Sequence, residues 1–249
     1  MSRIGSNAAK SGILTYQEAM NVTANNIANV NTTGYKPFRA SLSDLIYTER
    51  DADVDLDYQR GHGVRNYKTD FKFAQGAPKE TGLDLDFYLG DRGLFMVEDV
   101  NGNTFFTKDG AFQITQTGED VWQLCDNFNS FVLDDEGNRI TVPFLTDQEG
   151  NLTQAIDYEA LEDAIGKYQF ENPSGLQKIG DNYYAQTDSS GEPVSNPDTD
   201  MRRGYLELSD TELSEEMVNM ITVQRAFQVN IKMYQTFSEM TQQVNSLKG

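Results

Sequence analysis

Acidic side chains are the first candidates for chemistry, because four of them alternate with other residues in DADVDLDYQ: Asp51, Asp53, Asp55 and Asp57. On a strand, this spacing places the four carboxylates on one face, where they could bind a cation. A calcium-binding EF-hand loop, however, needs glycine at position six and glutamate at position twelve. Counted from Asp51, these positions hold Leu56 and His62, so we interpret the stretch as a solvated acidic loop.

The single histidine and the single cysteine restrict catalytic and metal chemistry further. His62 stands between glycines without a nucleophile motif, which argues against a catalytic triad or a His-rich metal site. Cys125 cannot form a disulfide within the chain and is predicted to be a core residue on a strand. No phosphate-binding loop or dinucleotide fingerprint is present. We therefore expect no catalytic residues, no cofactor and no metal. A glycosidase with two carboxylates is the enzymatic alternative, but no pair stands out among 39 acidic residues.

Charge and hydropathy exclude further classes of protein. The 249 residues carry a formal net charge of −19, which argues against binding to nucleic acid or to an anionic membrane surface. No apolar run is long enough for a transmembrane helix, so lipid insertion is not expected. The N-terminus lacks the apolar stretch of a signal peptide, so export would need a route without a cleaved signal.

Two long helices are predicted, one at each end of the chain. Near the N-terminus, apolar positions recur in steps of four and three, which predicts a helix over residues 6–33 with a coiled-coil seam. After Ala9, this seam contains Ile13, Tyr16, Met20, Thr23, Ile27 and Val30. Gly34 is expected to end the helix in a left-handed conformation, with Tyr35 contacting Val30 as in a Schellman motif.

The C-terminal helix is predicted to span about 38 residues, with Ser209 as N-cap and Glu212 as its capping-box partner. Its seam contains Leu213, Met217, Met220, Phe227, Ile231 and Tyr234, then slips by one position to Met233, Phe237, Met240, Val244 and Leu247. Each helix has one apolar stripe and a polar back. Two interpretations stay open: the two ends pack on each other and close one globule, or neighbouring copies complete the pair.

Asparagines beside the N-terminal seam are a separate feature of the stretch NVTANNIANVNTTGYKP. Asn25, Asn26 and Asn29 flank Ile27, and a buried polar residue beside such a seam can fix its register. We expect these amides, Asn26 in particular, to form hydrogen bonds with neighbouring subunits.

The middle of the chain is predicted to be mostly β. Turn pairs at Asn101-Gly102, Asp109-Gly110 and Gly137-Asn138 separate aromatic and β-branched runs, which indicates a small barrel or sandwich. A short helix is expected near residues 158–165. The predicted fold class is α+β, with the terminal helices forming a coiled-coil-like domain. The expected division is 1–34 with 209–249 as an assembly domain, 35–80 as an extended connection, and 81–208 as a central β-rich domain.

Several motifs spread over the chain resemble the bacterial flagellar axial proteins, which form the rod and hook of the flagellar basal body. The resemblance rests on NVTANNIANVNTTGYK, FAQGAPKETGLDLDFYLGDRGLFMV, FFTKDGAF and GYLELSDTELSEEMVNMITVQRAFQVNIKMY. Lys108 stands where the family usually has arginine, and residues 146–168 match least well. The length resembles that of the rod proteins. The N-terminal motif and the GYLE…EEM…QRAF ending resemble the distal rod protein more than the proximal one.

The resemblance implies a structural subunit of a hollow helical filament that transmits torque and conducts exported subunits. Its expected partners are copies of itself, other rod and hook subunits, and the flagellar type III export apparatus. The expected location is the basal body, outside the cytoplasmic membrane. The terminal helices are expected to fold on assembly. The alternatives are a hook protein or hook-like paralogue, and a secreted coiled-coil adhesin with closed symmetry.

Overall fold

A computed structural model describes residues 2–45, 48–49, 59–71, 73–90, 92–118, 121–146 and 152–247. The acidic face predicted at residues 51–57 lies outside the described residues. The fold is α+β, with a helix at each end and a mostly β middle, as predicted. The chain divides into two compact units. The helical unit comprises residues 1–29, 37–72 and 211–249, and the β unit comprises residues 30–36 and 73–210.

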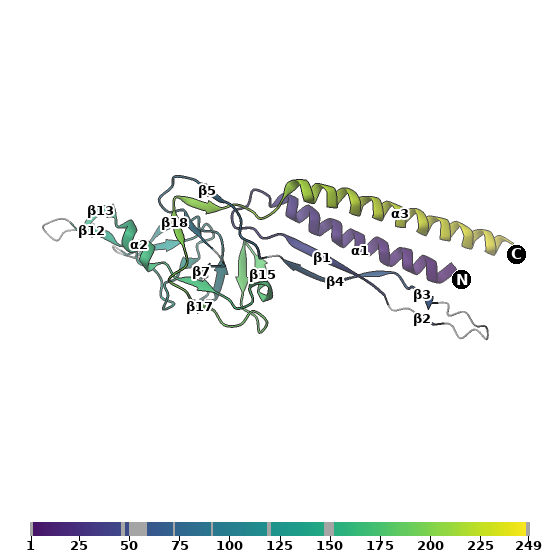
Figure 1. The fold of residues 1–249 in the computed structure, drawn as a ribbon, viewed down its shortest axis with the longest axis horizontal. Helices are drawn as coiled ribbons and strands as arrows, with labels where there is room; N and C mark the ends of the chain where they lie inside the picture. Colours follow the sequence, from purple (N-terminus) through teal and green to yellow (C-terminus); the bar gives the residue numbers. More distant parts are fainter. Residues whose placement is uncertain are drawn as a thin grey trace. The chain divides into compact units, whose positions relative to one another are not determined.

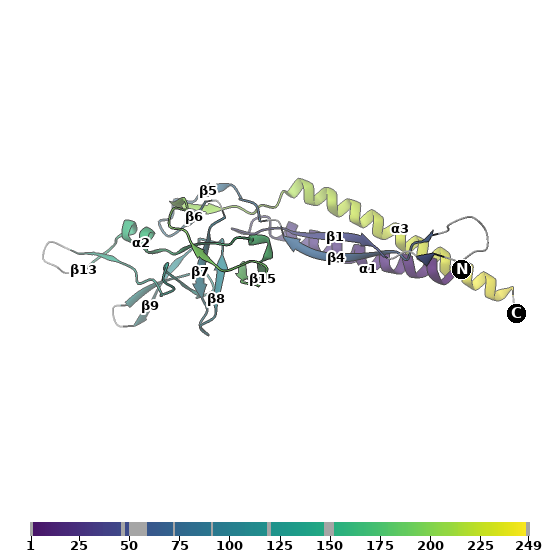
Figure 2. The same cartoon turned by 60° about the horizontal axis from the view of Figure 1, so that its bottom comes forward.

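The helical unit is built around two long helices, α1 (Ser2–Ala28) and α3 (Leu213–Ser246). They lie side by side, and α1 also contacts a long hairpin (Figures 1 and 2). The hairpin pairs β1 (Phe38–Asp44) antiparallel with β4 (Val64–Phe71), and β2 (Thr48–Glu49) pairs with β3 (Gln59–Arg60). The two ends of the chain therefore pack on each other, as the first of our two interpretations expected.

The β unit is organised by one antiparallel sheet in the order β15-β16-β8-β7-β11-β10-β9, with β14 on β7 and β17 on β14. Its strands are β7 (Leu94–Glu98), β8 (Thr104–Thr107), β9 (Gln113–Gly118), β10 (Val121–Cys125), β11 (Phe131–Val132), β14 (Lys167–Gln169), β15 (Gln177–Gly180), β16 (Tyr183–Ala185) and β17 (Val194–Ser195). The path of paired strands does not close on itself, so the described strands do not form a closed barrel, which was one of the two predicted alternatives.

Shorter pairs complete the β unit. Strand β5 (Pro78–Glu80) pairs with β19 (Tyr205–Glu207), β6 (Phe87–Leu89) with β18 (Met201–Arg203), and β12 (Phe144–Thr146) with β13 (Leu152–Ile156). A 3₁₀ turn, η1, covers Pro173–Gly175. Strands β5 and β6 thus pair with the last two strands of the unit, which brings residues near 80 next to residues near 205.

Two of the three predicted turn pairs are confirmed. Gly102 and Gly137 have positive φ and close tight turns, with their N–H groups donating to Asp99 O and Asp134 O. The Asp109-Gly110 pair does not join two paired strands, so that hairpin prediction is wrong. A Cβ on Gly110 would lie 1.8 Å from Phe87 O, so glycine here allows two backbones to approach closely.

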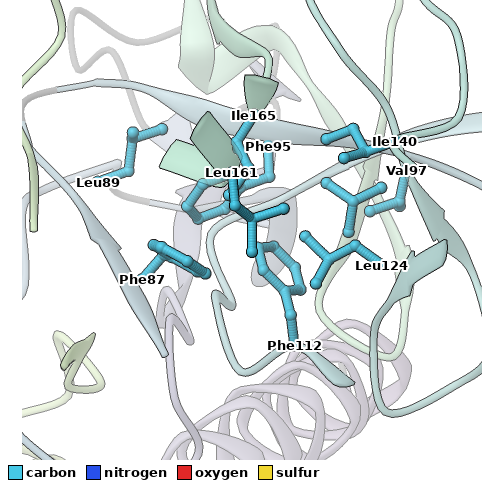
Figure 3. Close-up of a cluster of buried hydrophobic side chains, with 10 residues drawn as sticks. Phe87, Leu89, Phe95, Val97, Phe112, Leu124, Ile140, Leu161 and Ile165 are labelled. Atoms are coloured by element: carbon cyan, nitrogen blue, oxygen red, sulfur yellow. The ribbon is translucent and has the colours of Figure 1, made fainter. Parts of the chain in front are cut away.

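The hydrophobic core of the β unit lies where the sheet meets β6 and α2 (Tyr158–Ala164) (Figure 3). Its members are Phe87, Leu89, Phe95, Val97, Phe112, Leu124, Val132, Ile140, Leu161 and Ile165. The α2 helix confirms the prediction near residues 158–165, and the Asp157 side chain caps it by accepting from Ala160 N. Cys125 is buried at the end of β10, as predicted.

Candidate assembly interface

The buried face of α1 is made of small and polar residues rather than large apolar ones. Its buried members are Ala9, Gly12, Thr15, Ala19, Thr23 and Asn26. Of the predicted seam, Ala9 and Thr23 lie on this face, together with Asn26 from its predicted flank. The larger seam side chains are only half-buried: Ile13, Tyr16, Met20 and Ile27. At three points the buried residue is the one directly before the predicted residue: Gly12 instead of Ile13, Ala19 instead of Met20, and Asn26 instead of Ile27. The packed seam is therefore displaced by one position there.

Close approach of the two helices explains this displacement. A Cβ added to Gly5 would lie 2.5 Å from the Phe237 ring, and one added to Gly12 would lie 2.4 Å from Asn230 Oδ1. Only residues without a side chain fit at these points of α1, so the larger neighbours are turned to the sides. Phe237, which the prediction placed on the seam, and Asn230, which it did not, reach into this narrow space from α3.

The α3 helix contributes a half-buried face and leaves the rest of its surface exposed. Met220, Phe227, Ile231 and Phe237 lie on the half-buried face, together with Val223 and Asn230. The other predicted seam residues of the C-terminal helix are exposed: Leu213, Met217, Met233, Tyr234, Met240, Val244 and Leu247. No residue of α3 is fully buried. A long helix with this many exposed apolar side chains has more apolar surface than its own chain covers.

Asn26 joins three elements of the helical unit. Its Nδ2 donates to Phe38 O at 2.8 Å and to Glu216 Oε1 at 2.9 Å, and its Oδ1 accepts from Phe38 N at 2.9 Å. Asn26 is 1% exposed. The amide therefore bonds within the chain in the single subunit, and the expectation that it also binds a neighbouring subunit stays a prediction.

The predicted end of the N-terminal helix is wrong, because α1 ends at Ala28, five residues before Thr33. The Asn29 side chain donates to Asn25 O at 2.9 Å and to Asn25 Oδ1 at 2.7 Å. Such local side-chain bonds, followed by polar and β-branched residues, compete with further helix. Val30, Gly34 and Tyr35 therefore do not form a Schellman ending, and they belong to the β unit instead.

The predicted capping box of the C-terminal helix is also wrong. Helix α3 begins at Leu213, so Glu212 is its N-cap and has no side-chain cap hydrogen bond. Ser209 lies too far before the first turn to cap it. Glu215 and Glu216 stand in the first turn, where negative charge is favourable beside the N-terminal end of the helix dipole.

Residues 30–36, which we call the strap, are held in the β unit by main-chain contacts. Gly34 has φ +64° and its N–H donates to Glu207 O at 2.8 Å. Asn182 Nδ2 donates to Thr33 O at 2.5 Å, and Lys178 Nζ donates to Lys36 O at 2.9 Å. The left-handed glycine was thus predicted at the right position, but it serves the attachment of the strap and not a helix end.

A buried ion cluster fastens the strap, and we define it as Lys36, Lys108 and Glu207. Glu207 Oε1 accepts from Lys36 Nζ and, at 2.7 Å, from Gly76 N. Glu207 Oε2 lies 3.2 Å from Lys108 Nζ and accepts from Gln75 Nε2 at 3.2 Å. The three charged side chains are 0 to 1% exposed. One carboxylate therefore joins three segments that lie far apart in the sequence.

Each lysine of the cluster has a further acceptor, which compensates part of its desolvation. Lys36 Nζ donates to Ala74 O, and Lys108 Nζ donates to Leu89 O at 2.8 Å. Lys108 is the residue that departs from the arginine of the family pattern, and it is fully buried. We did not predict this cluster, because its members are separated by up to 171 residues.

Lys178 lies beside the cluster in a setting that disfavours its charge. Its Nζ lies 3.7 Å from the centre of the Tyr35 ring, a cation–π contact that by itself favours the charge, so the cause lies elsewhere. Burial, with a smaller contribution from the Lys36 charge, lowers the pKa of Lys178 from 10.5 to about 8. Between these two pKa values the unfolded chain binds more protons than the folded chain, so this residue makes stability rise with pH.

We expect Lys178→Met to remove that rise. From about pH 7 to about pH 9.5, the wild type should gain stability relative to the variant, because only the wild type releases this proton. Urea unfolding at each pH, followed by fluorescence of Trp122 in β10, measures the difference. Burial also raises the pKa values of Cys125 and Tyr183. Both residues are present in the wild type and in the variant, so their contributions to the pH dependence of stability cancel in the comparison. If the free energies of unfolding of the wild type and the variant changed in parallel with pH, the lowered pKa of Lys178 would be contradicted.

The residues that the structure describes offer neither a metal site nor a membrane span. Within them, no group of three or more histidine, cysteine or acidic side chains is arranged to hold a metal ion. None of their helices combines the length and apolar character needed to cross a membrane.

Comparison with known proteins gives matches at both ends and along the whole chain. A family model described as flagella basal body rod protein matches residues 7–36, and one described as flagellar basal body rod FlgEFG protein C-terminal matches residues 202–247. These two segments hold α1 with the strap, and β19 with α3.

Three relatives that match over nearly the whole chain are named flagellar basal-body rod protein FlgG. The protein of Buchnera aphidicola subsp. Baizongia pistaciae is 34% identical, over 96% of this chain and 97% of its own. That of Borreliella burgdorferi is also 34% identical, with the same coverage. That of Bacillus subtilis is 30% identical, over 96% of both chains.

Proposed function

The chain belongs to the flagellar basal-body rod protein family as a structural subunit of the rod, and we propose that it polymerises through its helical unit into a hollow helical filament. The filament transmits torque and conducts exported subunits. The observation that carries this proposal is the apolar surface that α3 leaves exposed in the single chain. Identical subunits that meet through non-identical surfaces form an open helical assembly.

Coiled-coil-like packing is completed in the assembled filament. Within one chain, α3 packs on the small-residue face of α1 and no α3 residue is fully buried. Helices of neighbouring copies cover the remaining apolar residues and add hydrophobic burial that the single chain lacks. This combines our two interpretations, because the ends pair within the chain and neighbours complete the pair.

The partners are copies of this chain, adjoining rod and hook subunits, and the flagellar export apparatus. The chain lies in the basal body, as its family does, and it reaches this position outside the cytoplasmic membrane by export. The hook alternative is not favoured, because the relatives described above carry the name of the rod protein. A secreted adhesin would form closed soluble oligomers instead of open filaments.

The test is a pair of charged substitutions on α3. Phe227→Asp with Ile231→Asp is expected to abolish incorporation into rods, because both side chains lie on the half-buried face toward α1. Basal bodies are isolated from a deletion strain expressing each variant and viewed by electron microscopy. Trp122 is the only tryptophan and lies in the β unit, so its unchanged fluorescence shows that this unit still folds.

The matched control adds the same two charges at exposed polar positions of the same helix. Gln235→Asp with Gln242→Asp is expected to enter rods normally. If the Phe227/Ile231 variant formed normal rods, the proposal that the chain polymerises through its helical unit would be overturned. Absence of the wild-type chain from isolated basal bodies would overturn the rod function itself.

A further inference from the structure

We propose that the chain forms an amide bond within itself, between the side chains of Lys108 and Gln75, with Glu207 as the group that moves the protons. The reaction occurs once in each chain and needs no other molecule. It goes beyond the proposed filament and does not depend on it, because all three residues lie in the β unit of a single chain.

The amide of Gln75 is held beside both of the other groups. Its Nε2 donates to Tyr88 Oη at 2.8 Å, to Leu89 O at 3.1 Å and to Glu207 Oε2 at 3.2 Å. This orientation turns the amide oxygen toward Lys108, whose Nζ lies 3.4 Å from Gln75 Oε1. Lys108 Nζ is itself held by Leu89 O at 2.8 Å. An amine and a carbonyl group that are fixed at close range react far faster than the same groups free in solution.

The amine has to lose a proton before it can attack the carbonyl carbon. Desolvation beside another cationic group is one of the ways in which proteins activate a lysine. Lys108 meets both conditions, because it is 1% exposed and the Lys36 ammonium contacts the same carboxylate of Glu207. Within the buried ion cluster, two amines share one carboxylate. Release of one proton from Lys108 therefore leaves one balanced ion pair, Lys36 with Glu207.

Glu207 is placed to carry protons between the two nitrogen atoms that react. Its Oε2 lies 3.2 Å from Lys108 Nζ, the nucleophile, and 3.2 Å from Gln75 Nε2, the leaving group. A carboxylate at this distance from both atoms can act first as a base and then as an acid. One oxygen atom thus serves both ends of the transfer.

The bonds and protons balance without a further reactant. Lys108 Nζ forms a bond to Cδ of Gln75, and the electron pair of the carbonyl moves to Oε1. The pair then returns, and the bond between Cδ and Nε2 breaks. The two protons that the lysine ammonium gives up pass by way of Glu207 to Nε2. An ammonium ion leaves, the carboxylate of Glu207 is restored, and nothing is oxidised or reduced.

Access to water differs between the two sides of the site. The charged side chains of Lys108 and Glu207 are 0 and 1% exposed, so water is kept from the reacting amine. Gln75 is an exposed residue, so the ammonium ion has a route to solvent. The product joins residues 33 positions apart, from the segment before β5 to the residue after β8. Such a bond closes a loop that persists when the chain unfolds.

Mass spectrometry of the purified full-length chain tests the proposal. After overnight incubation at neutral pH, the wild type should be lighter than its sequence mass by one ammonia molecule. Trypsin should then fail to cut after Lys108 and should release the peptide that begins at Phe73 joined to the peptide from Gly93 to Arg139. Fragmentation of the joined peptide locates the bond, which distinguishes it from loss of ammonia by cyclisation at Asn101 before Gly102.

Three variants identify the groups involved. Lys108→Arg keeps the positive charge but has no amine that can attack, so it should keep its full sequence mass. Glu207→Gln keeps the amine and the amide but cannot carry protons, so most of its chains should stay unlinked. The matched control is Lys178→Met, which removes the half-buried lysine beside the cluster and should lose ammonia like the wild type. Trp122 fluorescence checks folding, and only chains recovered as folded monomer by gel filtration are analysed.

The outcomes decide between an amide bond and a cluster held by charge alone. A folded wild-type chain with its full sequence mass would overturn the proposal, as would a joined peptide from Lys108→Arg. An unchanged yield of joined peptide from folded Glu207→Gln would overturn the role of Glu207 as proton carrier. None of these results bears on the proposed rod function, which is tested separately by incorporation of the chain into basal bodies.

Discussion

Replacing Glu207 with glutamine is expected to lower the free energy of unfolding of the β unit by about 3–5 kcal/mol, the usual effect of removing one partner from a buried ion pair. The carboxylate is 1% exposed and accepts from Lys36, Gly76 and Gln75. Glutamine keeps the shape but removes the only negative charge that the cluster contains. Lys36 and Lys108 would then be two buried cations that have lost the carboxylate they share.

Glu98→Gln is the matched control for this substitution. Glu98 pairs with Arg139 at 2.9 Å in the same unit, but the two side chains are 22% and 36% exposed. An ion pair that water can reach contributes less than about 1 kcal/mol, so this variant should unfold almost like the wild type. The two carboxylates thus undergo the same chemical change and differ in burial.

Urea unfolding followed by Trp122 fluorescence measures both variants. A triple replacement, Lys36→Met with Lys108→Met and Glu207→Leu, should recover much of the lost stability, because it removes the charges together. Equal midpoints for Glu207→Gln and Glu98→Gln would contradict a stabilising role for the buried ion cluster. The comparison also tests the attachment of the strap, since Lys36 is its last residue.

The elements of the fold were largely predictable from local pattern, whereas the contacts that fasten them were not. Helix periodicity, glycine turns and the short α2 helix depend on neighbouring residues, and they appear near the predicted positions. The contact between Lys36 and Glu207 joins residues 171 positions apart, and no local pattern indicates which buried lysine meets which carboxylate. The hydrogen bond between Asn26 and Glu216 joins residues 190 positions apart, so no local sequence pattern predicts it either.

The one-position error in the α1 seam has a different cause. We selected the largest apolar residues, Ile13, Met20 and Ile27, because hydrophobic burial usually favours them. Packing instead uses Gly12, Ala19 and Asn26, because α3 approaches α1 too closely for larger side chains. A heptad of small residues, at 5, 12 and 19, was visible in the sequence and was the signal that could have located this face.

Substituting Asn26 by leucine is expected to destabilise the helical unit by about 2–4 kcal/mol, because it leaves buried hydrogen-bonding groups without the amide that bonds them. Phe38 exchanges two hydrogen bonds with Asn26, and Glu216 receives a third. Leucine is similar in size, so the loss comes from polar groups rather than from a cavity. The buried amide therefore fixes how α1 meets β1 and α3.

Asn25→Leu provides the control, because Asn25 is exposed and its side chain accepts from Asn29, the residue directly after α1. This variant should differ from the wild type by less than about 0.5 kcal/mol. Hydrogen exchange measures both, with the Phe38 amide as the local reporter of the bond to Asn26 Oδ1. Faster exchange at Phe38 in Asn26→Leu, but not in Asn25→Leu, is the expected result. Unchanged exchange combined with lost assembly would instead favour an amide that binds a neighbouring subunit, and would support the expectation drawn from the sequence.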